Sequence, residues 1–138
     1  MIGRMHHVVL DCRDPDALAQ FYSALLGLPV TYRDHDWVVV AANDTTSGLA
    51  FQRVPGHRPP TWPDPATPQQ FHLDIMVEDP AAAGPRVLAL GATTLDGDDV
   101  YADPAGHPFC LILRPRWAPP IIPNDTAIPD PASTTSAD

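Results

Sequence analysis

The sequence predicts an α+β fold in which a βαβββ unit occurs twice and the strands form one cupped, mixed sheet. Three observations predict this fold. Two strand-like segments that begin with histidine lie 65 positions apart, at residues 7 and 72; an Asp-Pro pair and a helical stretch follow each of them; and three short strand-like segments follow each helical stretch. With 138 residues, the chain is long enough for one domain with its own hydrophobic core.

The first strand of each unit carries the clearest part of the repeat. Residues 7–15 read HVVLDCRDP and residues 72–80 read HLDIMVEDP, so a histidine and an Asp-Pro pair recur at the same spacing. Because alternate side chains of a strand point to opposite faces, each segment is expected to turn one face toward the helices and one away from them. The face turned away carries His7, Val9 and Asp11 in the first unit and His72, Asp74 and Met76 in the second. These faces predict a concave, partly polar surface.

A helix is expected directly after each Asp-Pro pair. In the first unit Asp14 is the expected N-cap, Pro15 the first helical residue and Gly27 the stop. Apolar residues recur at helical spacing between them, namely Leu18, Phe21, Tyr22 and Leu25. In the second unit Gly84 and Pro85 fall inside the expected helix, where a proline removes one backbone hydrogen bond. The second helix is therefore expected to be kinked or to begin late.

The strand pattern also sets the expected domain boundaries. Strands are predicted at residues 30–33, 37–42 and 49–54 in the first unit and at residues 93–95, 100–102 and 109–114 in the second. One domain is expected over residues 1–116, with the first unit at about 5–54, a linker at 55–69 and the second unit at about 70–115. The Pro-rich C-terminal tail, residues 117–138, is predicted to be extended or disordered.

Charge and composition exclude several classes of partner. The chain has 17 acidic and 8 basic residues and a formal net charge of -9, so nucleic acids and anionic membranes are poor partners. No run of about 18 apolar residues that could span a membrane occurs in the sequence, and a cytoplasmic location is expected. Cys12 and Cys110 lie in apolar runs, where a free thiol packs as a small hydrophobic group, and no disulfide is expected in the cytoplasm.

Four motifs together resemble the vicinal oxygen chelate superfamily, which includes glyoxalase I, extradiol dioxygenases, fosfomycin-resistance thiol transferases and bleomycin-binding proteins. The motifs are His7 with Asp14-Pro15, the linker segment 62–65 (WPDP), His72 with Asp79-Pro80, and the closing segment 103–110 (DPAGHPFC). The likeness covers roughly residues 5–115. It implies the glyoxalase/bleomycin resistance fold, a small-molecule ligand and a homodimer.

The resemblance also implies a set of metal ligands. In metal-bearing members these come from the first and last strands of each unit, usually a histidine and a glutamate. Matched by position they are His7, Gln52, His72 and Cys110, the second and fourth because each lies four residues after a glycine that opens a final strand. A divalent metal such as Zn, Ni, Mn or Fe is implied there. However, Gln52 and Cys110 replace both carboxylates, which favours a site without metal.

The predicted ligand pocket extends this set with residues of the same face and of the loops. It comprises His7, Gln52, Trp62, His72, Asp74, Tyr101 and Cys110. Simpler structural interpretations exist for several residues. A strand histidine is often a hydrogen-bonded scaffold residue, the apolar neighbours of Cys110 suit packing better than nucleophilic attack, and Tyr22 fits the helix stripe as well as a ligand contact. No residue is assigned as catalytic.

Two functions of different classes follow. The resemblance implies a glyoxalase-like protein that binds a small organic molecule in its cup, with lyase, isomerase or dioxygenase-type chemistry if a metal on His7 and His72 acts as a Lewis acid. The alternative is a metal-free binding or sequestration protein of the bleomycin-resistance type, which needs only an apolar cup and a dimer groove. A third interpretation is a vestigial pocket in a partner-binding unit.

Overall fold

The computed structural model describes residues 1–122, and its elements form two βαβββ units in succession. Module 1 comprises β1 (His7–Cys12), α1 (Pro15–Leu26), β2 (Val30–Arg33), β3 (Trp37–Val40) and β4 (Gly48–Arg53). Module 2 comprises β5 (Leu73–Val77), α2 (Pro80–Ala89), β6 (Thr93–Thr94), β7 (Val100–Ala102) and β8 (Pro108–Leu113). The predicted α+β fold with two βαβββ units is confirmed. The prediction for the tail falls mostly on residues 123–138, which lie outside the described residues.

The strands of residues 1–122 are arranged as two four-stranded mixed sheets, one per module. The strand orders are β1-β4-β3-β2 and β5-β8-β7-β6. In each sheet the first strand of the module pairs in parallel with the last, and the other pairs are antiparallel. Parallel neighbours cannot be joined by a tight turn, so the helix and the two middle strands make up the connection between them.

Helix α1 begins and ends where the sequence predicts. The Asp14 carboxylate accepts a hydrogen bond of 3.1 Å from the backbone N–H of Ala17. Pro15 occupies the first helical position, where a backbone donor has no partner within the helix, and Gly27 ends the helix with a φ of 64°. These caps fix α1 directly after β1.

Helix α2 begins immediately after Asp79, so the predicted late start is wrong. The Asp79 carboxylate accepts hydrogen bonds from the N–H groups of Ala81 and Ala82 at 2.9 and 3.3 Å, which orders the first turn ahead of Pro85. Gly84 sets how closely this helix approaches its sheet. A Cβ atom at residue 84 would lie only 2.7 Å from the Tyr101 hydroxyl.

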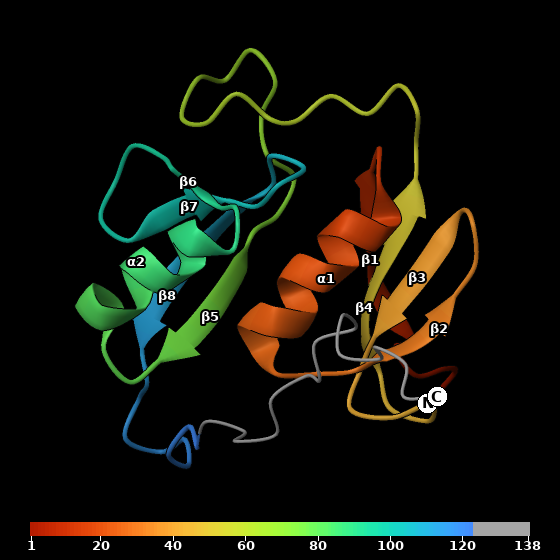
Figure 1. The fold of residues 1–138 in the computed structure, drawn as a ribbon, viewed down its shortest axis with the longest axis horizontal. Coiled ribbons are helices and arrows are strands. Elements are labelled where there is room, and N and C mark those ends of the chain that lie inside the picture. The colour runs from red at the N-terminus through yellow and green to blue at the C-terminus, as the bar shows by residue number, and fades with distance from the viewer. Residues whose placement is uncertain (123–138) are drawn as a thin grey trace, which may run out of the picture.

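The two modules share one hydrophobic core, in which α1 lies between the two sheets (Figure 1). Tyr22 stacks on Phe51 of β4 with ring centroids 5.5 Å apart, and Phe21 meets Phe109 of β8 in an edge contact at 5.9 Å. Other buried members of this core are Leu10, Cys12, Leu18, Val38 and Val40 from module 1 and Val87, Tyr101 and Leu111 from module 2. The aromatic side chains of α1 therefore join the modules.

Both helices lie on the same side of the sheets in Figure 1, and we call the opposite side of each sheet its helix-free face. Val8 and Leu10 of β1 pack toward the core, as do Leu73 and Ile75 of β5. The alternating residues consequently lie on the helix-free faces: His7, Val9 and Asp11 in module 1, and His72, Asp74 and Met76 in module 2.

Candidate functional site

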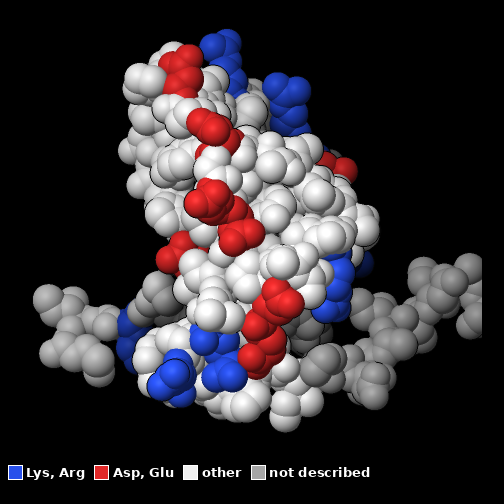
Figure 2. Space-filling model, turned by 90° about the vertical axis from the view of Figure 1, so that its left-hand side faces the viewer, with Lys and Arg blue, Asp and Glu red and all other residues white. Residues whose placement is uncertain are grey.

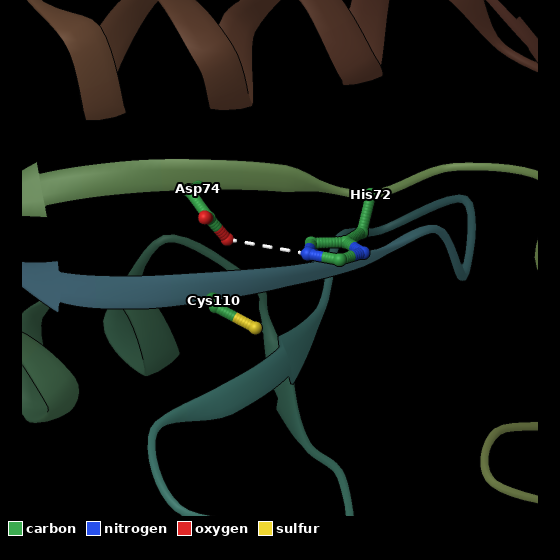
Figure 3. A group of neighbouring side chains, drawn as sticks. All are labelled: His72, Asp74 and Cys110. Carbon is green, nitrogen blue, oxygen red and sulfur yellow. Dashed lines mark ion pairs between the residues drawn. The ribbon is translucent and has the colours of Figure 1, made fainter.

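Three polar side chains meet on the helix-free face of module 2 (Figure 3). His72 immediately precedes β5, Asp74 lies on β5, and Cys110 is the register partner of Asp74 on β8. One donor atom from each residue lies within 4.8 Å of the other two, and Nε2 of His72 is 3.3 Å from Oδ1 of Asp74. Within residues 1–122, no other three His, Cys, Asp or Glu side chains come together in this way. We call this group the module 2 cluster.

Apolar side chains border the module 2 cluster. Met76 follows Asp74 on the same face, Ile112 is the register partner of Met76, and Val100 of β7 is the partner of Cys110. Met76 is 40% exposed, so this apolar surface is open to solvent. Many small-molecule sites consist of a few polar groups set in an apolar surface, as this one does.

The cluster offers nitrogen, oxygen and sulfur donors but no activated nucleophile. Burial, together with the negative charge of Asp74, raises the pKa of the Cys110 thiol. The thiol therefore stays protonated at neutral pH, and the thiol is a far weaker nucleophile than the thiolate. His72 and Asp74 are about half exposed, so both side chains are accessible to a ligand.

His7, the repeat counterpart of His72, is bonded to the backbone of its own module. The N–H of Gly48 donates a hydrogen bond of 3.1 Å to Nδ1 of His7. A backbone N–H can only donate, so Nδ1 is the acceptor and the neutral ring carries its proton on Nε2. Burial and the adjacent His6 lower the pKa of His7, which favours this neutral form. Neither ring nitrogen then has a free lone pair.

Gln52 lies apart from the module 2 cluster, at a cavity of about 490 Å³ in module 1. The cavity is lined by Asp34, His35, Asp36, Trp37, Gln52, Arg53 and Pro55. Of this group only Gln52 was predicted from the sequence, although the Asp-His-Asp run between two strands was a signal for the others. A second cavity, of about 420 Å³, is lined by Cys12, Arg13, Asp14, Ala17, Leu18, His57, Pro59, Pro104 and Ala105. Neither cavity includes the module 2 cluster, which lies on an open sheet face.

Two aromatic residues of the predicted pocket lie elsewhere. Tyr101 is only 8% exposed and stacks on Phe109 in the core, at 5.7 Å between ring centroids, because its position on β7 turns it toward α2. It therefore does not line the helix-free face. The indole N–H of Trp62 donates a hydrogen bond of 2.8 Å to the Asp96 carbonyl, which ties the linker to the turn between β6 and β7. Trp62 lines neither of the two cavities.

Comparison with families of known proteins matches residues 7–112 to the glyoxalase-like domain. The chain belongs to this family. Solved structures of glyoxalase relatives share the fold. An enzyme of the glyoxalase/bleomycin resistance protein/dioxygenase family from Burkholderia phytofirmans PsJN superposes with a TM-score of 0.60 at 17% identity, over 79% of this chain and 97% of its own. No curated protein matches the chain by sequence.

Two further solved structures share the fold, one of a glyoxalase and one of a binding protein. The trypanothione-dependent glyoxalase I of Leishmania major has a TM-score of 0.58 at 21% identity, over 80% of this chain and 86% of its own. A bleomycin-binding protein complexed with bleomycin has a TM-score of 0.50 at 22% identity, over 82% of this chain and 99% of its own. At these identities the likeness establishes the fold.

The metal ligands that the glyoxalase superfamily implies do not fit this chain as a set. They would be His7, Gln52, His72 and Cys110. His7 accepts the Gly48 hydrogen bond, Gln52 offers only a neutral amide, and the side chain that joins His72 and Cys110 is Asp74. A metal shared between the two modules is therefore not supported by these residues.

The surface of module 2 is rich in acidic groups. Figure 2 shows Asp and Glu side chains in a line down this face, with Arg side chains toward its two ends. The net charge of the chain is -9.

Within the described residues, neither helix has the length and apolarity that crossing a bilayer requires.

Proposed function

We propose that this member of the glyoxalase-like family binds a small organic molecule on the helix-free face of module 2, with the module 2 cluster as its polar contacts. The observation that carries the proposal is the convergence of an imidazole, a carboxylate and a thiol on an otherwise apolar strand surface. Polar groups of this kind fix the orientation of a ligand, while the surrounding apolar side chains contribute most of the buried area.

The side chains of the cluster suit a ligand that carries neighbouring oxygen atoms. A protonated ring nitrogen of His72 can donate to one oxygen, and the Asp74 carboxylate can accept a hydrogen bond from a hydroxyl group or take its proton. The 3.3 Å separation of Nε2 and Oδ1 allows the two groups to exchange a proton through a bound ligand. Such a pair supports lyase or isomerase-type proton transfer.

The second candidate is sequestration without turnover. It is favoured by the residues at the implied ligand positions, since Gln52 is neutral and His7 is engaged with Gly48. A binding protein needs an apolar surface and a few orienting polar groups, and it needs no activated base or metal.

We further propose that the protein is a homodimer in which a second copy covers the helix-free faces. Val9 on module 1 and Met76 on module 2 are 38% and 40% exposed, and the module 2 cluster lies in neither of the two cavities. A covering subunit would exclude water from the ligand. Cys12 and Cys110 are free thiols, which suits a reducing compartment such as the cytoplasm.

A nuclear magnetic resonance titration of the ¹⁵N-labelled protein, with chelator present, tests the proposed function. The probes are a hemithioacetal, a catechol and bleomycin, and each is also assayed for turnover, once with chelator and once with divalent metal added. Binding should shift the amide signals of Asp74, Met76 and Cys110, and Asp74→Ala should weaken it. Asp36→Ala is the matched control, because Asp36 is an exposed acid at the module 1 cavity. Amide signal shifts confined to the module 1 cavity, or no shifts with any probe, would contradict the proposal. Formation of a product from a bound probe would identify an enzyme, and binding without product would identify a sequestration protein.

A further inference from the structure

We infer that module 2 alone holds a zinc ion, bound by Nε2 of His72, a carboxylate oxygen of Asp74 and Sγ of Cys110. This zinc site deepens the proposed function and rests on it in one respect: the organic ligand is taken to bind on the helix-free face of module 2, where the three side chains lie. It replaces a metal shared between modules with a site inside one module, and it gives Asp74 the role of the missing carboxylate.

The geometry of the module 2 cluster is close to that of a zinc site. Tetrahedral zinc with bonds of about 2.0 to 2.3 Å holds its ligand atoms roughly 3.3 to 3.7 Å from one another. Nε2 of His72 and Oδ1 of Asp74 are already 3.3 Å apart, and all three donor atoms lie within 4.8 Å. Because His72 and Asp74 are about half exposed, small side-chain rotations bring the donors onto one ion without movement of the strands.

The types of donor select the metal. Imidazole, carboxylate and thiolate together suit zinc, whereas Mg, Ca and Mn prefer oxygen-rich sites. Zinc binding displaces the Cys110 thiol proton to solvent, and the resulting thiolate and the Asp74 carboxylate together balance the charge of a divalent ion. Three protein ligands leave the fourth position open toward solvent, which is the pattern of catalytic rather than structural zinc. A ligand oxygen on the helix-free face could occupy that position.

The repeat provides an internal comparison. In module 1 the position that matches Asp74 is Val9, and its register partner on β4 is Ala50. The same place in the other sheet is thus apolar, and neither the strand pairing nor the core requires polar residues there. The acid and the thiol in module 2 are therefore not explained by the fold.

The test is a titration of the full chain, freed of metal with chelator, by calorimetry with Zn²⁺, Ni²⁺ and Mn²⁺ and by absorption spectroscopy with Co²⁺. We expect one zinc ion per chain, with Mn²⁺ at least about tenfold weaker. Cobalt should give a thiolate-to-metal charge-transfer band in the unaltered protein, so sulfur ligation is examined without any substitution. Asp74→Asn and Cys110→Ser should each weaken zinc binding by more than about tenfold, since even residues that only support a ligand cost 10- to 100-fold.

The matched controls are His7→Gln and Asp11→Asn on the helix-free face of module 1, and both should bind zinc as the unaltered chain does. The inference is overturned if zinc does not bind, if the cobalt spectrum lacks the sulfur band, or if His7→Gln abolishes binding. Circular dichroism confirms that each variant is folded. No organic molecule is present in this titration, and the ligand titration above contains chelator, so the zinc site and the proposed function can fail separately.

Discussion

The hydroxyl of Tyr22 on α1 donates a hydrogen bond of 2.8 Å to Oδ2 of Asp103, in the turn between β7 and β8. This is a buried contact between the two modules, since Asp103 is only 3% exposed. The other carboxylate oxygen accepts the backbone N–H groups of Ala105 and His107 at 2.9 and 3.0 Å. Asp103 thereby shapes its own turn and anchors that turn to the helix of the other module.

Tyr22→Phe should lower the free energy of unfolding by about 1 to 3 kcal/mol, because it leaves one oxygen of a buried carboxylate without its donor. Urea denaturation measures the change. Tyr32→Phe is the matched control: Tyr32 also donates to an aspartate, Asp34, but at an exposed site, so its loss should have a much smaller effect. Equal effects of the two substitutions would show that the buried position of the Tyr22 contact is unimportant.

Stability should fall at alkaline pH through the same contact. Burial and the charge of Asp103 raise the pKa of Tyr22 in the folded protein. The folded state therefore holds this proton more tightly than the unfolded chain, whose tyrosine has a pKa of about 10. The contribution is fully present below about pH 10 and is lost as the pH rises further. Urea midpoints from pH 8 to about pH 11 should decline for the natural chain and decline less for Tyr22→Phe. Parallel curves would assign the decline to other groups.

The two cysteines should react with alkylating reagents at very different rates. Cys12 is 1% exposed, and burial, with the charge of Asp103, raises its pKa to about 11. Its modification in the metal-free native protein should wait for unfolding, whereas the partly exposed Cys110 should react first. Mass spectrometry of peptides from a labelling time course measures both rates. Denaturant should equalise them, and rapid native labelling of Cys12 would contradict its place in the core.

Gly84→Ala should destabilise the protein, although alanine normally stabilises a helix by about 1 kcal/mol relative to glycine. The added methyl group would lie 2.7 Å from the Tyr101 hydroxyl, and overpacking of this kind costs about 1 to 3 kcal/mol. The double variant Gly84→Ala with Tyr101→Phe should recover stability, since the next ring atom is 3.8 Å away. Thermal unfolding of Gly84→Ala, Tyr101→Phe and the double variant measures the effect, and a double variant no better than Gly84→Ala would exclude the hydroxyl as the cause.

Local signals in the sequence predicted most of the fold. Asp14, Pro15 and Gly27 fix the ends of α1 through caps that depend on a few neighbouring residues. For α2, Pro85 suggested a kink or a late start, and the late start is wrong because the Asp79 cap determines where the helix begins. Short-range patterns are reliable when one signal acts alone, and they are weaker when two compete.

Strand register was harder to predict. The sequence prediction treated Gln52 and Cys110 as equivalent, because each lies four residues after a glycine. In the structure Gln52 pairs with Asp11. The repeat counterpart of Asp11 is Met76, and Met76 pairs with Ile112. Ile112 is therefore the counterpart of Gln52. The connections before the two final strands differ in length, and pairing between distant segments decides the register. The Gly48 hydrogen bond that engages His7 was invisible for the same reason.

The helices of the two halves contribute unequally to the contacts that join them, despite the repeated pattern. The positions of α2 that match Phe21 and Tyr22 of α1 are Arg86 and Val87. Of the two helices, only α1 therefore reaches the other half with aromatic rings, to Phe109 and Asp103. The module 2 cluster lies on the opposite side of its sheet from these contacts, so its side chains take no part in joining the halves. A chimera assembled from two later halves would have no such joint.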